Sequence, residues 1–193
     1  GDHVLILGAT GVTGSVAVQL AKKVFKAERV VVAGRNTERL NWLRTVGADD
    51  VIALGTDDLA ETVAAQHTER PYDAVIDYLW GMPAQQTLGA LAAAHSSAHF
   101  HATRFIQVGA MAGETISVDA QTLRSTGITL QGLGIGSVPP EALMRARSEG
   151  LPAMFAMLDS GELQLTTVAK PLADIENIWA TTEPSGTRVV ITP

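Results

Sequence analysis

The most informative absence in this sequence is that of cysteine. Its 193 residues contain none, so neither disulfide bonds nor thiolate metal sites can form. A chain without disulfides is compatible with the cytoplasm, which is where we expect this protein. Aromatic residues are also scarce, at 5%, whereas apolar residues of all kinds reach 46%. Such a composition is typical of a packed α/β sheet and is sufficient for one sizeable core with an appendage.

A second shortage is that of positive charge. Lysine and arginine number 14 against 20 acidic residues, which gives a net charge of −6. Proteins that bind nucleic acid or an anionic membrane surface usually have the opposite balance, so we expect neither partner. No apolar segment approaches the ~20 residues that span a bilayer, and no signal peptide is visible. We therefore expect a small molecule as the partner.

Glycine is plentiful, and the stretch Gly8–Gly14 is the most informative part of the chain. It follows the apolar run Val4–Leu7, which predicts a buried strand, and it precedes apolar residues at helical spacing. A strand that turns through glycines into a helix directs backbone N–H groups and the positive helix end at one point, which suits a phosphate. Gly11 would admit a pyrophosphate, and Gly14 would let helix and strand pack closely. The match to G-x-G-x-x-G is imperfect, because Ala9 replaces the first glycine.

The second strand, Arg29–Ala33, ends in Gly34, Arg35 and Asn36. An NAD-binding unit usually has Asp or Glu at this point, which would repel a 2′-phosphate. Here Gly34 leaves room and Arg35 offers donors that suit phosphate oxygens, so we predict NADP as the cofactor. One such contact contributes ~1.5–3 kcal/mol, a roughly ten- to hundredfold preference. The alternative is a solvated Arg35, and Arg39 either adds a second charge or lies on the surface.

Strands and helices alternate along the chain as in βαβ units. The pattern predicts a doubly wound parallel Rossmann sheet in the order 3-2-1-4-5-6, followed by a C-terminal tail. The six expected strands are Val4–Leu7, Arg29–Ala33, Val51–Leu54, Asp73–Asp77, Phe105–Gly109 and Ile128–Gly132. We expect helices from Thr37 to near Gly47, from Leu59 (capped by Asp57 or Asp58) to about His67, and from near Pro83 to about Ala94.

Ligands of such sheets bind at the carboxyl ends of the strands, near the switch between strands one and four. Asp77 and Tyr78 end the fourth strand, and Val108, Gly109 and Ala110 end the fifth. These residues are candidates for contacts to ribose and nicotinamide, with ordinary loops as the alternative. The complete set of predicted cofactor-binding residues is Thr10, Gly11, Val12, Thr13, Gly14, Gly34, Arg35, Asn36, Asp77, Tyr78, Val108, Gly109 and Ala110.

The segment Val4–Lys22 resembles the signature G-A-x-G-x-x-G-x-x-A-x-Q-L-A-K of quinone oxidoreductase-like medium-chain dehydrogenases/reductases. The resemblance continues through the pattern from Leu40 to Asp49 and the closing run Gly186–Ile191. It implies hydride transfer from NADPH to an enone, quinone or aldehyde type of substrate. Family members also carry an N-terminal GroES-like domain, so we expect this chain to be the cofactor-binding half and inactive by itself. Catalytic residues and zinc ligands cannot be assigned in it.

The resemblance also suggests a division of the chain into two parts. Residues 1–160 are expected to form the NADP-binding domain. Residues 161–193 match a segment that in the family packs with the catalytic domain. The strands Leu163–Leu165 and Val189–Ile191 are therefore expected to lack their usual partners and to be mobile or rearranged.

The sixth strand would lie at an edge of the sheet, with apolar Ile128, Leu130 and Leu133. An exposed apolar edge favours pairing across a two-fold axis, so we expect a homodimer with a continuous sheet. The alternative is an edge covered by Pro139, Pro140 and the helix Glu141–Arg147.

Other chemistries have weaker support. His95, His99 and His101 could hold a metal, but we expect surface histidines and no metal. A short-chain dehydrogenase would need Lys four residues after Tyr78, where Met82 stands, and no serine nucleophile elbow is present. Two other classes stay open: a non-catalytic NADP-sensing regulator, and an interaction module that has lost its cofactor.

Overall fold

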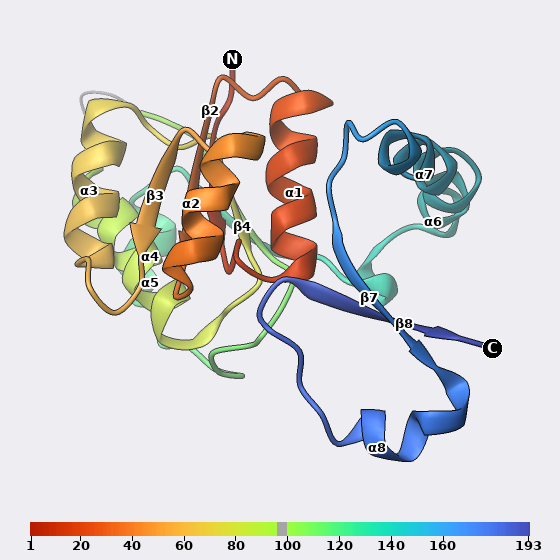
Figure 1. Ribbon diagram of the computed structural model, residues 1–193. Helices are drawn as coiled ribbons and strands as arrows, with labels where there is room; N and C mark the ends of the chain where they lie inside the picture. The colour runs from red at the N-terminus through yellow and green to blue at the C-terminus, as the bar shows by residue number, and fades with distance from the viewer. Residues whose placement is uncertain (96–99) are drawn as a thin grey trace.

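A six-stranded parallel sheet forms the centre of the computed structural model, which describes residues 1–95 and 100–193. The strand order β3-β2-β1-β4-β5-β6 confirms the predicted Rossmann topology (Figure 1). All neighbouring strands pair in parallel, so their carboxyl ends meet at one edge of the sheet. The strands are β1 (His3–Leu7), β2 (Arg29–Gly34), β3 (Asp50–Ala53), β4 (Ala74–Asp77), β5 (Thr103–Gln107) and β6 (Ile128–Gly132).

Helices cover both faces of this sheet. Every residue of β1 is buried: Val4 and Ile6 pack toward one face, and Leu5 and Leu7 toward the other. A strand enclosed on both sides reads as a continuous apolar run, which is why the sequence predicted it clearly. The first face carries α1 (Val12–Lys23) and α2 (Thr37–Val46), and the second carries α3 (Leu59–Glu69), α4 (Gly81–Ala93) and the short α5 (Ala120–Arg124).

Several helix ends follow the predicted signals. Asp58, and not Asp57, caps α3 by accepting a hydrogen bond of 2.9 Å from the Glu61 N–H. Gly47 ends α2 with a φ of 141°, a value that favours glycine. The fifth strand was predicted two residues too late. The N–H of Val108 makes the last ladder bond, to the carbonyl oxygen of Asp77, and the N–H of Gly109 bonds to the same oxygen, so the chain turns away there.

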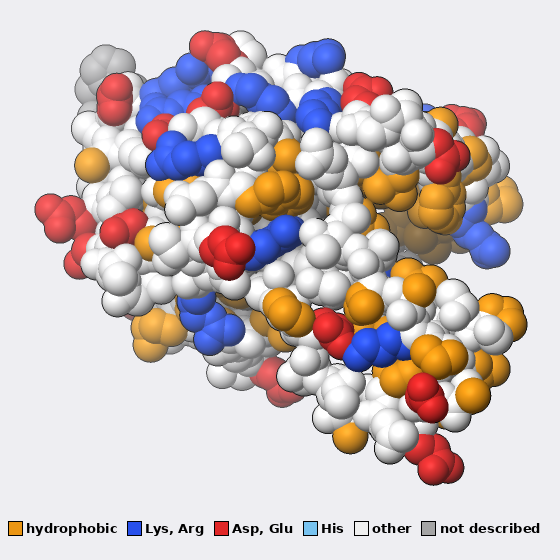
Figure 2. Space-filling view, viewed as in Figure 1, with side chains coloured by type: hydrophobic (Ala, Val, Ile, Leu, Met, Phe, Trp, Pro, Cys, Tyr) orange, Lys and Arg blue, Asp and Glu red, His pale blue; other side chains and the backbone are white. Residues whose placement is uncertain are grey.

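The C-terminal part continues from β6 through η1 (Ile135–Ser137) into a long helical arm. The arm is longer than the predicted helix Glu141–Arg147, since α6 (Pro140–Arg145) passes through a π-helical turn, η2 (Ala146–Gly150), into α7 (Leu151–Asp159). Figure 2 shows hydrophobic side chains gathered over this arm, where Met144, Leu151 and Phe155 are exposed. No helix in the described ranges is long and apolar enough to cross a membrane.

The last segment forms a separate two-stranded parallel sheet of β7 (Thr166–Pro171) and β8 (Thr187–Thr192), which pair with each other. Between them lie η3 (Leu172–Asp174) and α8 (Ile175–Trp179), and the pair extends away from α1 (Figure 1). The segment Leu163–Leu165, which was expected to lack its usual strand partners, forms no strand in this structure. Leu163 is buried, and the backbone of Gln164 bonds to the side chain of Gln19 in α1 and not to a strand.

Candidate functional site

A cleft of about 840 Å³ opens at the carboxyl ends of β1 to β4. This edge of the sheet is where the sequence placed the ligand, and the volume lies in the range of small-molecule sites. The cleft is lined by Gly8, Thr10, Gly11, Gly34, Arg35, Leu54, Gly55, Asp57, Asp58, Leu59, Leu79, Met82, Pro83, Gln86, Met111, Ala112 and Ser185.

The glycine loop between β1 and α1 combines a glycine needed for packing with one that leaves open space. A Cβ on Gly14 would lie 2.4 Å from the carbonyl oxygen of Gly8, so only glycine lets α1 start so close to β1. A Cβ on Gly11 would meet nothing nearer than 3.6 Å. Helix α1 also begins without a side-chain cap on its N-terminal N–H groups. The loop therefore presents free helix-terminal donors beside the cleft.

At the end of β2, Gly34 and Arg35 line the cleft, and Gly34 is also required for packing. A Cβ on Gly34 would lie 2.4 Å from the methyl carbon of Thr10, so the space beside Gly34 is filled by Thr10. Arg35 is exposed. Asn36 is not among the cleft-lining residues: its side chain caps α2 by accepting from the N–H of Arg39 at 2.9 Å.

Arg39 lies one turn into α2 and is half-buried. Its guanidinium carbon is 4.0 Å from the ring centre of Trp42, and Nη1 donates to Thr166 Oγ1 at 3.4 Å. The Nε and Nη2 atoms are buried, and neither has a hydrogen-bond partner within the described ranges. Burial lowers the pKa of Arg39, because the charged form loses hydration. A buried cation with unused donors is a suitable partner for an anion.

The residues predicted after β4 and β5 are not among those that line the cleft. The carboxylate of Asp77 is fully buried and accepts hydrogen bonds from the N–H groups of Leu79 and Trp80. Burial raises the pKa of Asp77, since desolvation opposes the charged form. Burial likewise raises the pKa of the half-buried Tyr78. Val108, Gly109 and Ala110 precede the lining residues Met111 and Ala112.

Sequence reasoning missed three parts of the wall. The first is the turn Leu54–Leu59 after β3, which the rule about strand ends could have found. The second is the side of α4 that carries Met82, Pro83 and Gln86. The third is Ser185, whose hydroxyl donates to the carbonyl oxygen of Thr10 at 3.2 Å. No local signal indicates that a residue so far along the chain returns to the glycine loop.

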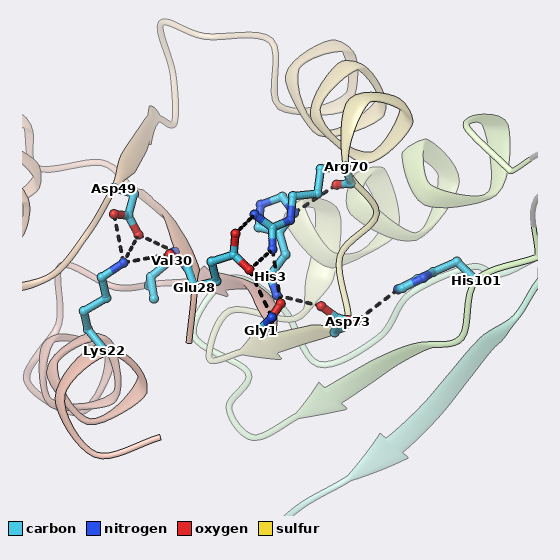
Figure 3. Close-up of polar contacts among 9 residues, drawn as sticks. All are labelled: Gly1, His3, Lys22, Glu28, Val30, Asp49, Arg70, Asp73 and His101. Atoms are coloured by element: carbon cyan, nitrogen blue, oxygen red, sulfur yellow. Dashed lines mark hydrogen bonds and ion pairs between the residues drawn. The ribbon is translucent and has the colours of Figure 1, made fainter. Parts of the chain in front are cut away.

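The opposite end of the sheet holds a polar network that is separate from the cleft. Figure 3 shows the carboxylate of Asp73 between the backbone N–H of His3, at 2.6 Å, and Nε2 of His101, at 3.3 Å. Of the predicted histidine group, His99 lies outside the described residues, and His95 lines a separate hollow between α4 and α5. The contacts of Asp73 with His3 and His101 join the starts of β1, β4 and β5.

The strand order, the glycine loop and the position of the cleft together define a Rossmann-type α/β domain. The family described as "Zinc-binding dehydrogenase" matches residues 12–149, and the chain belongs to this family. This membership supports the predicted resemblance to medium-chain dehydrogenases/reductases.

Two curated relatives and one solved structure show the range of similarity. The "Probable NADPH-dependent quinone reductase tdiC" of Emericella nidulans is 27% identical over 207 residues, covering 100% of this chain and 54% of its own length. The trans-enoyl reductase poxH of Penicillium oxalicum is 33% identical over 78 residues, which cover 40% of this chain and 20% of its own. A quinone oxidoreductase structure from Pseudomonas syringae has a TM-score of 0.71 and 21% identity, covering 100% of this chain and 57% of its own. This chain thus spans about half the length of tdiC, and its match to poxH covers a fifth of that protein.

The family description implies zinc, but the residues present do not fit a zinc site. The chain contains no cysteine. Within residues 1–95 and 100–193, no three His, Asp or Glu side chains are arranged to hold a metal ion. We therefore assign no metal ligand in this chain.

Proposed function

We propose that this chain binds NADP(H) and forms the cofactor half of an oxidoreductase that reduces a quinone, enone or aldehyde type of substrate. The observation that carries this proposal is the glycine loop, where an uncapped helix α1 begins beside open space at Gly11. The names of tdiC and poxH, a quinone reductase and an enoyl reductase, support the reaction class.

The proposed site assigns the diphosphate to the first turn of α1. The N–H groups of Val12, Thr13 and Gly14 would be the donors there, with Thr10 and Gly11 beside them, and the positive end of the helix would favour the negative charge. On the other side, Tyr78, Val108, Gly109 and Ala110 are the proposed neighbours of ribose and nicotinamide. They lie next to the lining residues Leu79 and Met111.

The 2′-phosphate is proposed to lie near Gly34, Arg35 and Asn36. Arg35 is exposed and lines the cleft, and no carboxylate stands at the end of β2 to repel a phosphate. Arg39, in the first turn of α2, adds a second positive charge near this strand end, although it does not line the cleft itself. Both features favour NADP over NAD.

When bound, NADPH would supply a hydride from its nicotinamide ring to an electrophilic carbon of the substrate, which would also take up a proton. The residues of this chain orient the cofactor for that transfer. Substrate recognition and catalytic groups belong to the proposed whole protein.

A calorimetric titration with NADPH and then NADH tests the proposal. We expect NADPH to bind at least ten times more tightly, and Arg35→Ala to weaken NADPH binding about tenfold with little effect on NADH. Equal losses for both cofactors would contradict the role of Arg35. Absence of binding to either cofactor would contradict the site itself, and tight binding without turnover in a longer protein would identify a regulator.

We further propose a homodimer through the edge of β6. This strand pairs with β5 alone within the described sheet, and Leu133 beyond its end is 44% exposed. Light scattering of the purified chain should give twice the monomer mass of 20.3 kDa. A monomeric mass at micromolar concentration would argue against this assembly. The cytoplasmic location stays a prediction from composition.

A further inference from the structure

Two segments that follow different strands form one continuous wall of the cleft. Leu79 comes from the turn after β4, and Met111 and Ala112 come from the loop after β5. The segments are hydrogen-bonded: the N–H of Ala112 donates to the carbonyl oxygen of Leu79 at 2.7 Å, and that of Met111 to Tyr78 at 3.4 Å. The shape of the turn after β4 therefore sets the position of the whole wall.

This turn has an unusual backbone. Trp80 has a φ of 55° and a ψ of −158°, a region that residues other than glycine rarely adopt, and Gly81 follows with a φ of 57°. A Cβ on Gly81 would lie 2.7 Å from the carbonyl oxygen of Ala112, so the start of α4 and the loop after β5 are in close contact. Such a conformation persists only when its surroundings hold it in place.

The group that holds the turn is the carboxylate of Asp77. Oδ1 accepts from the N–H of Leu79 at 2.8 Å and from that of Trp80 at 3.1 Å, and Oδ2 also lies 3.1 Å from the Trp80 nitrogen. The residue is fully buried, and it does not line the cleft. Both oxygens are thus directed at the backbone of the turn.

We infer that Asp77 is a positioning residue: its buried carboxylate fixes the strained turn at Leu79 and Trp80, and thereby the cleft wall that the cofactor meets. This role differs from the direct ribose contact that the end of β4 suggested. The inference rests on the proposed cofactor site for its consequence, but the hold on the turn can be measured without any cofactor.

The test compares Asp77→Leu with Asp77→Asn by NADPH titration and by amide hydrogen exchange of the cofactor-free protein. Leucine branches at the same atom, is somewhat larger and has no acceptor, so we expect about tenfold weaker NADPH binding and faster exchange at Leu79, Trp80 and Ala112. Asparagine retains one oxygen that both N–H groups can use. It should restore slow exchange and limit the loss of affinity to about threefold.

A second variant perturbs the same cleft wall without changing Asp77. Gly81→Ala forces the Cβ against Ala112, and we expect it to weaken NADPH binding by about tenfold. Gly89→Ala is its matched control, since Gly89 lies in the same helix and a Cβ there would meet nothing within 4 Å. Its NADPH affinity should equal that of the unmodified chain.

Asp73→Asn is the matched control for Asp77. Asp73 also accepts a backbone N–H, from His3, but just before the other end of β4 (Figure 3). This variant should lower stability and leave NADPH affinity unchanged. Equal loss of affinity in Asp77→Asn and Asp77→Leu, with unaltered exchange at Leu79 and Trp80, would overturn the inference and indicate direct contact. If the unmodified chain fails to bind NADPH, the proposed function fails, and the exchange rates alone decide the role of Asp77.

Discussion

Single residues of the glycine loop differ in what the protein itself requires of them. A Cβ on Gly14 would approach a backbone oxygen to 2.4 Å, whereas one on Gly11 would stay 3.6 Å from the same atom. We expect Gly14→Ala to lower the free energy of unfolding by ~1–3 kcal/mol. Gly11→Ala should change it by less than ~1 kcal/mol but weaken NADPH binding. Urea unfolding and calorimetry measure the two quantities, and equal losses of stability would contradict this division of roles.

Residue identity predicted some of these roles and not others. Gly14 was predicted correctly because helix–strand packing after a glycine turn is a local requirement. Gly34 was interpreted as space for a phosphate, and no sequence pattern shows that the side chain of Thr10 also packs against it, because only the fold brings Thr10 there. Asp77 was interpreted as a ribose contact, and no sequence pattern shows that its oxygens face the next turn.

Whole elements are also connected by single buried side chains, and Gln19 of α1 is the clearest case. Its Nε2 donates to the carbonyl oxygen of Gln164 at 2.9 Å, and its Oε1 accepts from the N–H of Gln164 at 2.8 Å. Gln19→Leu would leave both backbone groups without partners, at ~1–3 kcal/mol. We expect faster proteolysis of residues 163–193 while the central sheet stays folded.

Gln164→Ala is the control for this prediction, because Gln164 contributes only backbone atoms to the contact. Its proteolysis rate should match that of the unmodified chain. If Gln19→Leu is cleaved no faster, the contact does not hold the segment in place.

For helices and strands, the sequence predicted that an element exists more accurately than it predicted the residues at which the element begins and ends. Buried strands such as β1 were predicted almost completely, because apolar runs between glycines are specific. The end of β5 was predicted too late, since the sequence does not show that the N–H of Gly109 bonds to the same carbonyl oxygen of Asp77 as that of Val108. The pairing of β7 with β8 depends on contacts across the chain that no local pattern encodes.

The molecule as a whole should lose stability in acid. His67 is buried at the end of α3, and its Nδ1 accepts from the N–H of Tyr72 at 3.0 Å. Desolvation lowers the pKa of His67 to about 4, with nearby His101, His3 and His95 adding to the effect. The unfolded chain, with a histidine pKa near 6.5, binds more protons below that pH, so stability falls as pH drops from 6.5 toward 4. Between pH 7 and pH 5 the expected loss is about 2 kcal/mol.

Urea unfolding at these two pH values measures the loss. Burial also lowers the pKa of His3, which adds to the trend in the same direction. His67→Asn keeps an acceptor at the position of Nδ1 but cannot be protonated, so its stability should fall less between pH 7 and pH 5. An identical fall in this variant would assign the acid sensitivity to other groups.

The hydrogen bond from Ser185 to Thr10 joins groups 175 residues apart. At ribosomal speeds of about 5–20 residues per second, the glycine loop emerges on the order of 10–30 s before the turn that borders it. During synthesis, the six-stranded sheet can therefore form before Ser185, which lines one side of the cleft, has been added. A protein that stops short of Ser185 through premature termination would keep the fold and expose Thr10 and Arg39 to solvent.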